Sequence, residues 1–189
     1  NYRELVKEAG KVAAGAEGLI CLPYIQGERA PVWDAQARGL WIGATIHHTQ
    51  HHFIRALLEG ICYAVYSVGK SLETTITPIQ SIEVSGGFIQ SLPWVQMLTD
   101  IFQKKVHITS TADASSTGAA ILGFVALGVF KNLEEAEKVV KIKKTLYPNK
   151  RLKKVYHAMH GLFEKTYEKN KLLFPEIVLL QKEYLKTNY

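Results

Sequence analysis

The segment from Val84 to Asp100 reads V-S-G-G-F-I-Q-S-L-P-W-V-Q-M-L-T-D and is the most informative stretch of the chain. A short apolar run stops at the adjacent glycines Gly86 and Gly87, and apolar residues at three- and four-residue spacing follow. This pattern predicts a strand, a tight turn and a helix. Because glycine has no Cβ, a ligand can approach the main chain at such a turn, and the free N–H groups at the start of the helix favour a phosphate or a nucleotide. Turns between a strand and a helix that bind no ligand have the same pattern. This motif alone therefore does not distinguish a ligand-binding turn from a purely structural one.

Strands and helices are predicted to alternate around this segment. The predicted strands cover residues 18–24, 39–46, 81–86 and 106–109. Two predicted helices cover residues 50–75 and 91–103. A third begins at the small-residue turn Ala112–Gly118 and ends at Leu127. Further helices are predicted to begin near Leu133, Leu152 and Tyr167. The helix over 50–75 is expected to be central and buried, through a face that includes Phe53, Ala56, Gly60 and Val65. The alternation predicts an α/β fold with at least one parallel pair of strands.

The composition is that of a folded cytosolic protein. The chain has 189 residues, of which 47% are hydrophobic and 21% charged, enough for a sizeable core. Cys21 and Cys62 lie in apolar patterns, which predicts buried reduced thiols, with a disulfide as the alternative. No apolar run is long enough to span a membrane and no signal peptide is expected, so a cytoplasmic location is expected as well. The chain begins at Asn1 inside an amphipathic pattern, which suggests a piece of a longer protein.

Positive charge is concentrated in the last third of the chain. Residues 1–130 hold 9 Lys and Arg against 10 Asp and Glu, whereas residues 131–189 hold 14 against 7. The lysines alternate with glutamates at helical spacings, which predicts a solvated helix surface with neither nucleic acid nor membrane as a partner. Nucleic-acid binding by this basic tail is the alternative, and it would depend steeply on salt.

Four histidines are grouped just before and at the start of the long predicted helix. His47 and His51 are four residues apart, as are His48 and His52. Zinc would need a third or fourth ligand, and neither cysteine is near in sequence. We therefore expect no physiological metal site here.

Several motifs in the same order resemble the FGGY family of carbohydrate kinases. The motifs are Leu22–Asp34 (LPYIQGERAPVWD), Gly39-x-Trp41-x-Gly43 followed by His52-Phe53-x-x-Ala56-x-Leu58-Glu59, the Gly86–Gly87 turn with Ser91 and Trp94, and Gly118-Ala119-Ala120. The resemblance implies a partial ribonuclease-H-like domain of the actin-like ATPase architecture with C-terminal helices. Residues 1–150 would form the C-terminal kinase domain without its first strands, and residues 151–189 a helical extension.

The resemblance also implies transfer of phosphate from ATP, with Mg²⁺, to a hydroxyl of a sugar or sugar acid. The motif over residues 22–34 is most similar to gluconate kinases, so gluconate, giving 6-phosphogluconate, is the first expectation and xylulose the alternative. The family's general-base aspartate and its N-terminal domain lie upstream of this chain. No catalytic residue is therefore expected here, and the chain alone is expected to be inactive. A non-catalytic actin-like binding module is the competing function class.

The site residues implied by the resemblance belong to two groups. Gly86, Gly87 and Ser91 would contact the nucleotide, and Ser116 and Gly118 would line its adenine side; Ser91 and Ser116 could equally cap helices.

Glu28 and Arg29 would face the cleft between domains, or form a pair that only orders their loop. The expected partners are a small-molecule sugar or sugar acid and the missing N-terminal domain. A homodimer is also possible, because a sheet without its first strands leaves an exposed edge or apolar face.

Overall fold

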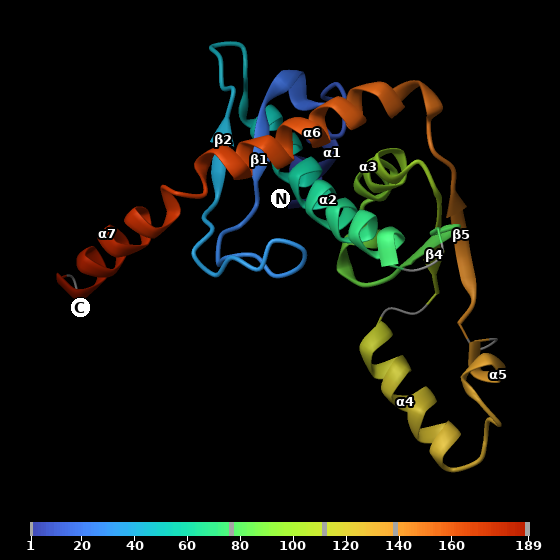
Figure 1. Ribbon diagram of the computed structural model, residues 1–189. Coiled ribbons are helices and arrows are strands. Elements are labelled where there is room, and N and C mark those ends of the chain that lie inside the picture. Colours follow the sequence, from blue (N-terminus) through green and yellow to red (C-terminus); the bar gives the residue numbers. More distant parts are fainter. Residues whose placement is uncertain (1, 76–77, 111–112, 138–139, 188–189) are drawn as a thin grey trace. The chain divides into compact units, whose positions relative to one another are not determined.

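In the computed structural model, the chain forms two compact units. Unit 1 comprises residues 1–78 and 150–189, and unit 2 comprises residues 79–149. The structure describes residues 2–75, 78–110, 113–137 and 140–187, so Ala112 of the predicted small-residue turn lies outside it. Figure 1 shows the elements of both units, which are taken one at a time below.

Unit 1 is built around one long helix and a short two-stranded sheet. Its elements are α1 (Tyr2–Ala9), a 3₁₀ turn η1 (Ala16–Gly18), β1 (Ile20–Leu22), β2 (Leu40–Ile42), α2 (Gln50–Thr75), η3 (Lys150–Leu152), α6 (Lys153–Asn170) and α7 (Phe174–Thr187). The strands β1 and β2 are antiparallel and pair Cys21 with Trp41. The helix α2 packs on β1 and α1, and α6 packs on β1 and α2 (Figure 1). The predicted strands over 18–24 and 39–46 are present but shorter.

A close backbone approach fixes α2 against β1. A Cβ added to Gly60 would clash with the carbonyl oxygen of Cys21, so only glycine lets the helix come this near. The predicted helix over 50–75 is confirmed, and Ala56 and Gly60 are buried as expected. The rest of the predicted face is wrong in part, because Phe53 and Val65 are 36% and 48% exposed. The structure buries Leu58, Cys62 and Tyr63 of α2 instead.

The aromatic core of unit 1 joins α2 to α6. Tyr63, Tyr156 and Phe163 are almost fully buried, and the ring centroid of Tyr63 lies 6.4 Å from Tyr156 and 5.6 Å from Phe163. Burying each side chain of this size contributes about 1.5–3 kcal/mol to stability. This packing therefore contributes to holding α2 against α6.

Both cysteines are buried free thiols, as the sequence predicts. Burial raises the pKa of Cys21 to about 12. Because the thiolate is the reactive form, we expect neither Cys21 nor Cys62 to react with a thiol reagent in the folded chain. Counting thiols labelled by an aromatic disulfide before and after adding guanidinium chloride would check this. Rapid labelling of a thiol under native conditions would contradict it.

A buried polar pair links α2 and α6 beside this core. The Oγ of Ser67 lies 2.9 Å from Nε2 of His160, which is 3% exposed, and Nδ1 of His160 lies 3.6 Å from a carboxylate oxygen of Glu164. Burial lowers the pKa of His160, although Glu164 opposes the shift. The folded chain therefore holds this ring neutral at pH values at which the unfolded chain protonates it.

The lowered pKa of His160 predicts a pH-dependent stability. As the pH falls below about 6.5, the unfolded state takes up a proton first, so the free energy of unfolding decreases. Urea denaturation measures the free energy of unfolding at pH 7.5 and at pH 5.5. The decrease between the two pH values should be smaller in His160→Gln than in the wild type. An equal pH dependence in both proteins would show that His160 is not responsible.

Unit 2 is a three-stranded sheet with helices. Its elements are β3 (Ser81–Val84), a 3₁₀ turn η2 (Gly87–Gln90), α3 (Leu92–Phe102), β4 (Lys105–Thr109), α4 (Ala114–Ala126), α5 (Leu133–Glu137) and β5 (Ile142–Leu146). The strands β3 and β4 are parallel, with Val84 opposite Ile108, which confirms the predicted parallel pair. The strand β5 adds to β4 in the antiparallel sense.

The core of unit 2 lies between α3 and the sheet. It is made of Val95, Leu98 and Phe102 from α3 and Val106 and Ile108 from β4, all 8% exposed or less. Pro93 in the first turn suits the start of α3, because its missing N–H is unneeded there. The predicted helix over 91–103 is thus confirmed.

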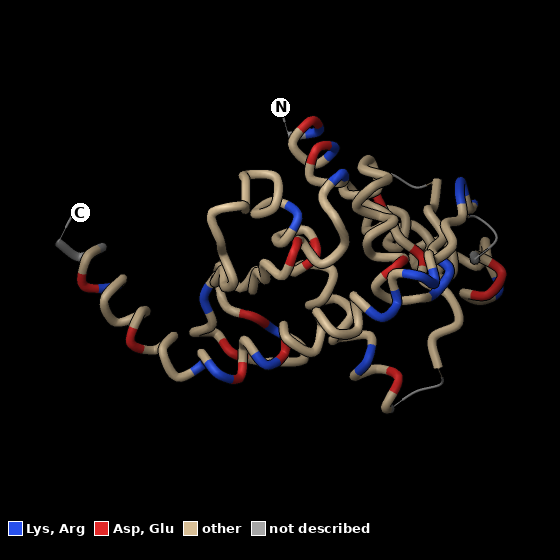
Figure 2. The backbone as a smooth tube through the Cα atoms, turned by 90° about the horizontal axis from the view of Figure 1, so that it is seen from above, with Lys and Arg blue, Asp and Glu red and all other residues tan. Residues whose placement is uncertain are grey.

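The C-terminal part of the chain departs from the prediction in two places. The segment 142–146, expected within a lysine-rich helical surface, is the strand β5. The last helix begins at Phe174 and not near Tyr167, because α6 continues to Asn170. Figure 2 shows basic and acidic residues interspersed along α6 and α7, as the spacing predicts for a solvated surface.

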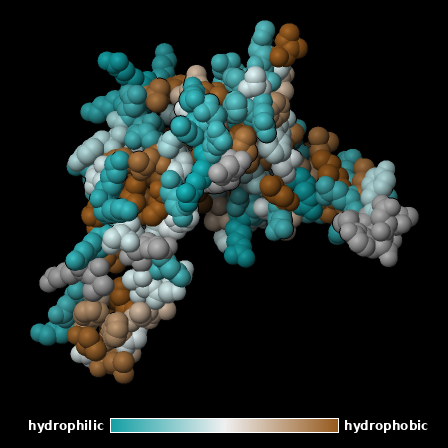
Figure 3. Space-filling model, turned by 180° about the vertical axis from the view of Figure 1, so that it is seen from behind, coloured by the Kyte–Doolittle hydropathy of each residue, from teal (hydrophilic) through white to brown (hydrophobic). Residues whose placement is uncertain are grey.

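Apolar side chains are exposed on unit 2 at α4 and the segment that follows it. No residue of α4 is buried, and Leu122, Phe124, Leu127, Val129 and Leu133 are between 45% and 79% exposed. Figure 3 shows brown apolar side chains gathered on this part of the molecule. No helix among the described residues is long and apolar enough to cross a membrane.

Candidate functional site

The Gly86–Gly87 turn lies where β3 ends and α3 is about to begin. Gly86 has φ 85° and ψ −171°, a backbone conformation that is essentially limited to glycine. Gly87 opens η2, and a Cβ added to either glycine would meet no atom within 4 Å. The turn therefore has open space in front of its main chain.

Parallel pairing brings a second strand end to the same place. Because β3 and β4 run in the same direction, Gly86 and Gly87 come together with Thr109 and Ser110 at the carboxyl edge of the sheet. Ligands of open α/β sheets bind at this edge. The Thr109 hydroxyl donates a hydrogen bond of 3.4 Å to the Val84 carbonyl, which ties the two strand ends together.

A cavity of about 530 Å³ occupies this corner of unit 2. Its volume lies within the range of small-ligand sites. It is lined by Gly86, Gly87, Gln90, Thr109, Ser110, Lys143 and Lys144 and by the apolar residues Ile89, Leu92 and Ile108. The sequence predicts the two glycines, but the lysines come from β5, which it does not predict.

Gly118 lines a separate cavity of about 280 Å³ in the same unit. This cavity is bordered by residues of β3, by Thr109 and by Ala114, Thr117 and Gly118 of α4. Thr109 lines both cavities, so the two spaces lie next to each other at the end of β4. The structure thus brings Gly86, Gly87 and Gly118 to neighbouring spaces.

The two predicted serines line neither cavity. Ser91 is the N-cap residue of α3, and its side chain makes no capping hydrogen bond. Ser116 belongs to the cap of α4, where its N–H and hydroxyl donate hydrogen bonds of 3.1 and 2.7 Å to the Asp113 carboxylate. These bonds hold the pKa of Asp113 below its usual value. A contact of either serine with a nucleotide stays a prediction.

Glu28 and Arg29 lie in unit 1, in a loop that closes on itself. Glu28 and Asp34 exchange two main-chain hydrogen bonds of 2.9 and 3.0 Å, and the Glu28 carboxylate accepts the Arg29 main-chain N–H at 2.8 Å. Asp34 accepts a hydrogen bond of 2.9 Å from the Tyr167 hydroxyl, which anchors the loop to α6. A cavity of about 470 Å³ beside this loop is lined by Pro31 and Val32 but not by Glu28 or Arg29. The role of this pair in substrate binding stays a prediction.

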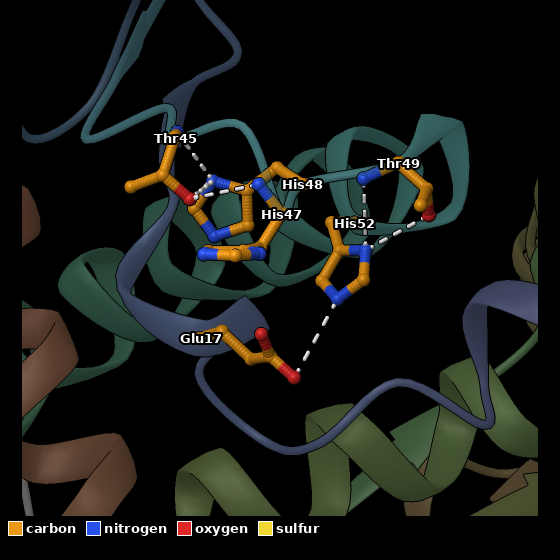
Figure 4. A network of polar contacts seen from close by, with 6 residues as sticks. All are labelled: Glu17, Thr45, His47, His48, Thr49 and His52. Atoms are coloured by element: carbon orange, nitrogen blue, oxygen red, sulfur yellow. Dashed lines mark hydrogen bonds and ion pairs between the residues drawn. The ribbon is translucent and has the colours of Figure 1, made fainter.

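Two of the histidines are turn and helix caps. Nδ1 of His48 accepts the Thr45 N–H at 2.9 Å, and Nδ1 of His52 accepts the Thr49 N–H at 3.2 Å (Figure 4). His52 follows Thr49 by three residues, so it takes the place that glutamate has in a capping box. Accepting these N–H groups occupies the Nδ1 lone pair of each ring. Among the residues described, no group of three or more His, Cys, Asp or Glu is arranged to hold a metal ion.

The glycine turn and the cavity lie together at the carboxyl edge of the parallel strands of an α/β unit. The chain belongs to a known family. Residues 2–127 match the description "FGGY family of carbohydrate kinases, C-terminal domain". The fold is the corresponding part of a ribonuclease-H-like domain of the actin-like ATPase architecture, followed by C-terminal helices.

Relatives with different sugar substrates are similar to this chain. It is 39% identical to a gluconokinase of Bacillus subtilis over 74% of this chain and 27% of the relative. It is 33% identical to a xylulose kinase of Staphylococcus epidermidis over 95% of this chain and 36% of the relative. The crystal structure of ligand-bound xylulose kinase from Lactobacillus acidophilus superposes with a TM-score of 0.86 at 29% identity, covering 94% of this chain and 36% of that one. The chain thus spans about a third of the length of these proteins.

Proposed function

We propose that this chain is the C-terminal, nucleotide-binding part of an ATP-dependent sugar kinase. The observation that carries the proposal is the cavity at Gly86 and Gly87, because it lies at the strand ends of a chain that belongs to the FGGY family. Gly86, Gly87 and Ser91 would contact the nucleotide, with Ser116 and Gly118 on the adenine side. The open main chain at the two glycines is suited to a ligand that approaches closely.

The reaction would transfer the γ-phosphoryl group of ATP to a hydroxyl of the sugar. Such a transfer depends on in-line positioning, on charge neutralisation by Mg²⁺ and on removal of the hydroxyl proton. The Mg²⁺ would be held chiefly by ATP phosphates and by an aspartate outside this chain, in keeping with the few protein ligands that magnesium takes. This chain would contribute the nucleotide side, with residues 1–150 as the kinase domain and residues 151–189 as a helical extension.

Gluconate is the substrate that we propose first, and xylulose is the alternative. Similarity to a gluconokinase supports gluconate, and similarity to a xylulose kinase over more of the chain supports the alternative. Glu28 and Arg29 would face the sugar side of the cleft. The partners would be the sugar and the rest of the kinase, in the cytoplasm, with a homodimer possible through the exposed apolar side chains near α4.

Measuring ADP release by the full-length parent protein tests the proposal. The assay would use Mg–ATP with gluconate, xylulose, ribulose, glycerol and fuculose. Turnover with one sugar supports the kinase and identifies the substrate. A folded parent that neither turns over nor binds ATP would overturn the proposal in favour of a binding module.

A further inference from the structure

A β-bulge places two consecutive lysines of β5 opposite one residue of β4. Ile108 pairs with Lys144, but the next residue of β4, Thr109, pairs with Ile142. Lys143 is therefore the extra residue of the bulge, so Lys143 and Lys144 both oppose Ile108. In a regular strand, neighbouring side chains point to opposite faces, and a bulge interrupts this alternation and redirects a side chain.

The bulge explains why both lysines line the same cavity. Lys143 and Lys144 border the space of about 530 Å³ together with Ile108, and Gly86 and Gly87 border it as well. No acidic residue lines this cavity in the part of the chain that the structure describes. The cavity therefore has two positive charges and nothing of opposite sign on its walls.

We propose that Lys143 and Lys144 bind the phosphate groups of the nucleotide that enters this cavity. The inference rests on the proposed function and adds a specific contact to it. Two ammonium groups attract a chain of phosphates, whereas an uncharged nucleoside would gain little from them. The two lysines would thus contact the phosphate groups directly, and the site would distinguish nucleotides by the charge of their phosphate chain.

The test compares ligands that differ only in their phosphate groups. Isothermal titration of the 189-residue chain would use adenosine, ADP and ATP, with Mg²⁺ present throughout. The variant is the double substitution K143Q/K144Q. Its matched control is K153Q/K154Q, which removes two consecutive exposed lysines from α6 of unit 1. Thermal unfolding would show that each variant is folded.

We expect K143Q/K144Q to weaken ADP and ATP binding by about tenfold and to leave adenosine binding unchanged. The single substitutions K143Q and K144Q should each weaken ADP and ATP binding, because both residues line the cavity. The control K153Q/K154Q should bind all three ligands as the wild type does.

Three other outcomes would overturn the inference. Unchanged ADP and ATP affinity in folded K143Q/K144Q would exclude the lysines and leave the nucleotide site intact. An equal loss for adenosine, ADP and ATP would show that the lysines only support the shape of the cavity. Absence of all binding in the wild-type chain would count against nucleotide binding itself, and with it against this contact.

Discussion

Replacing Glu59 by alanine should lower the free energy of unfolding by about 3–5 kcal/mol, the usual cost of breaking a buried ion pair. Glu59 is 1% exposed, and its carboxylate accepts a hydrogen bond of 2.6 Å from Arg55, one turn earlier in α2, and one of 3.1 Å from the Gly15 N–H. Arg55 also donates to the Tyr156 hydroxyl at 2.8 Å. Without the carboxylate, the guanidinium stays buried without its counter-charge. Urea denaturation followed by circular dichroism measures the loss.

Two controls separate this effect from a general cost of changing a glutamate. Glu168→Ala removes an exposed ion pair with Lys171 and should cost less than about 1 kcal/mol. The double variant R55M/E59L removes both charges and should recover much of the stability that E59A loses, because no buried charge remains. If E59A were no less stable than E168A, the buried pair would not hold α2 in place.

The sequence predicts the elements whose pattern is local. The helix over residues 50–75 and the strand–turn–helix around Gly86 follow from periodicity and from glycine, which act within a few residues. The buried face of α2 is less predictable, because Arg55 and Glu59 are charged and yet lie in the core. Their burial depends on their pairing and on the hydrogen bonds to Gly15 and Tyr156, which lie far from α2 in the sequence.

The strand β5 could not be predicted because its evidence is non-local. Residues 142–146 read I-K-K-T-L, in which the bulge at Lys143 breaks the alternation that identifies a strand. Its partner β4 lies more than thirty residues earlier in the chain. Strand preference depends strongly on such partners. The glycine half of the candidate site could therefore be predicted from the sequence, whereas the lysine half could not.

Replacing Gly87 by valine should weaken ATP binding by about a hundredfold, or about 2.7 kcal/mol, while leaving the fold intact. A Cβ at Gly87 meets no atom within 4 Å, so we expect a valine side chain to be accommodated there and to occupy the space proposed for the nucleotide. Gly86→Ala should behave differently. The backbone of Gly86, with φ 85° and ψ −171°, would be strained in any other residue. We therefore expect Gly86→Ala to lower the free energy of unfolding by about 1–3 kcal/mol.

Gly123→Val is the matched control, because Gly123 lies in the same unit and also has open space around it. Titration with ATP and urea denaturation should show normal binding and stability for this variant. If Gly87→Val bound ATP as tightly as Gly123→Val does, the nucleotide would not approach the main chain at this turn. Comparing the Gly86 and Gly87 variants gives a second test of nucleotide binding. If the turn had only a structural role, Gly86→Ala would be less stable, but Gly87→Val would bind ATP with the wild-type affinity. Loss of ATP affinity in a stable Gly87→Val protein therefore requires a ligand in front of the turn.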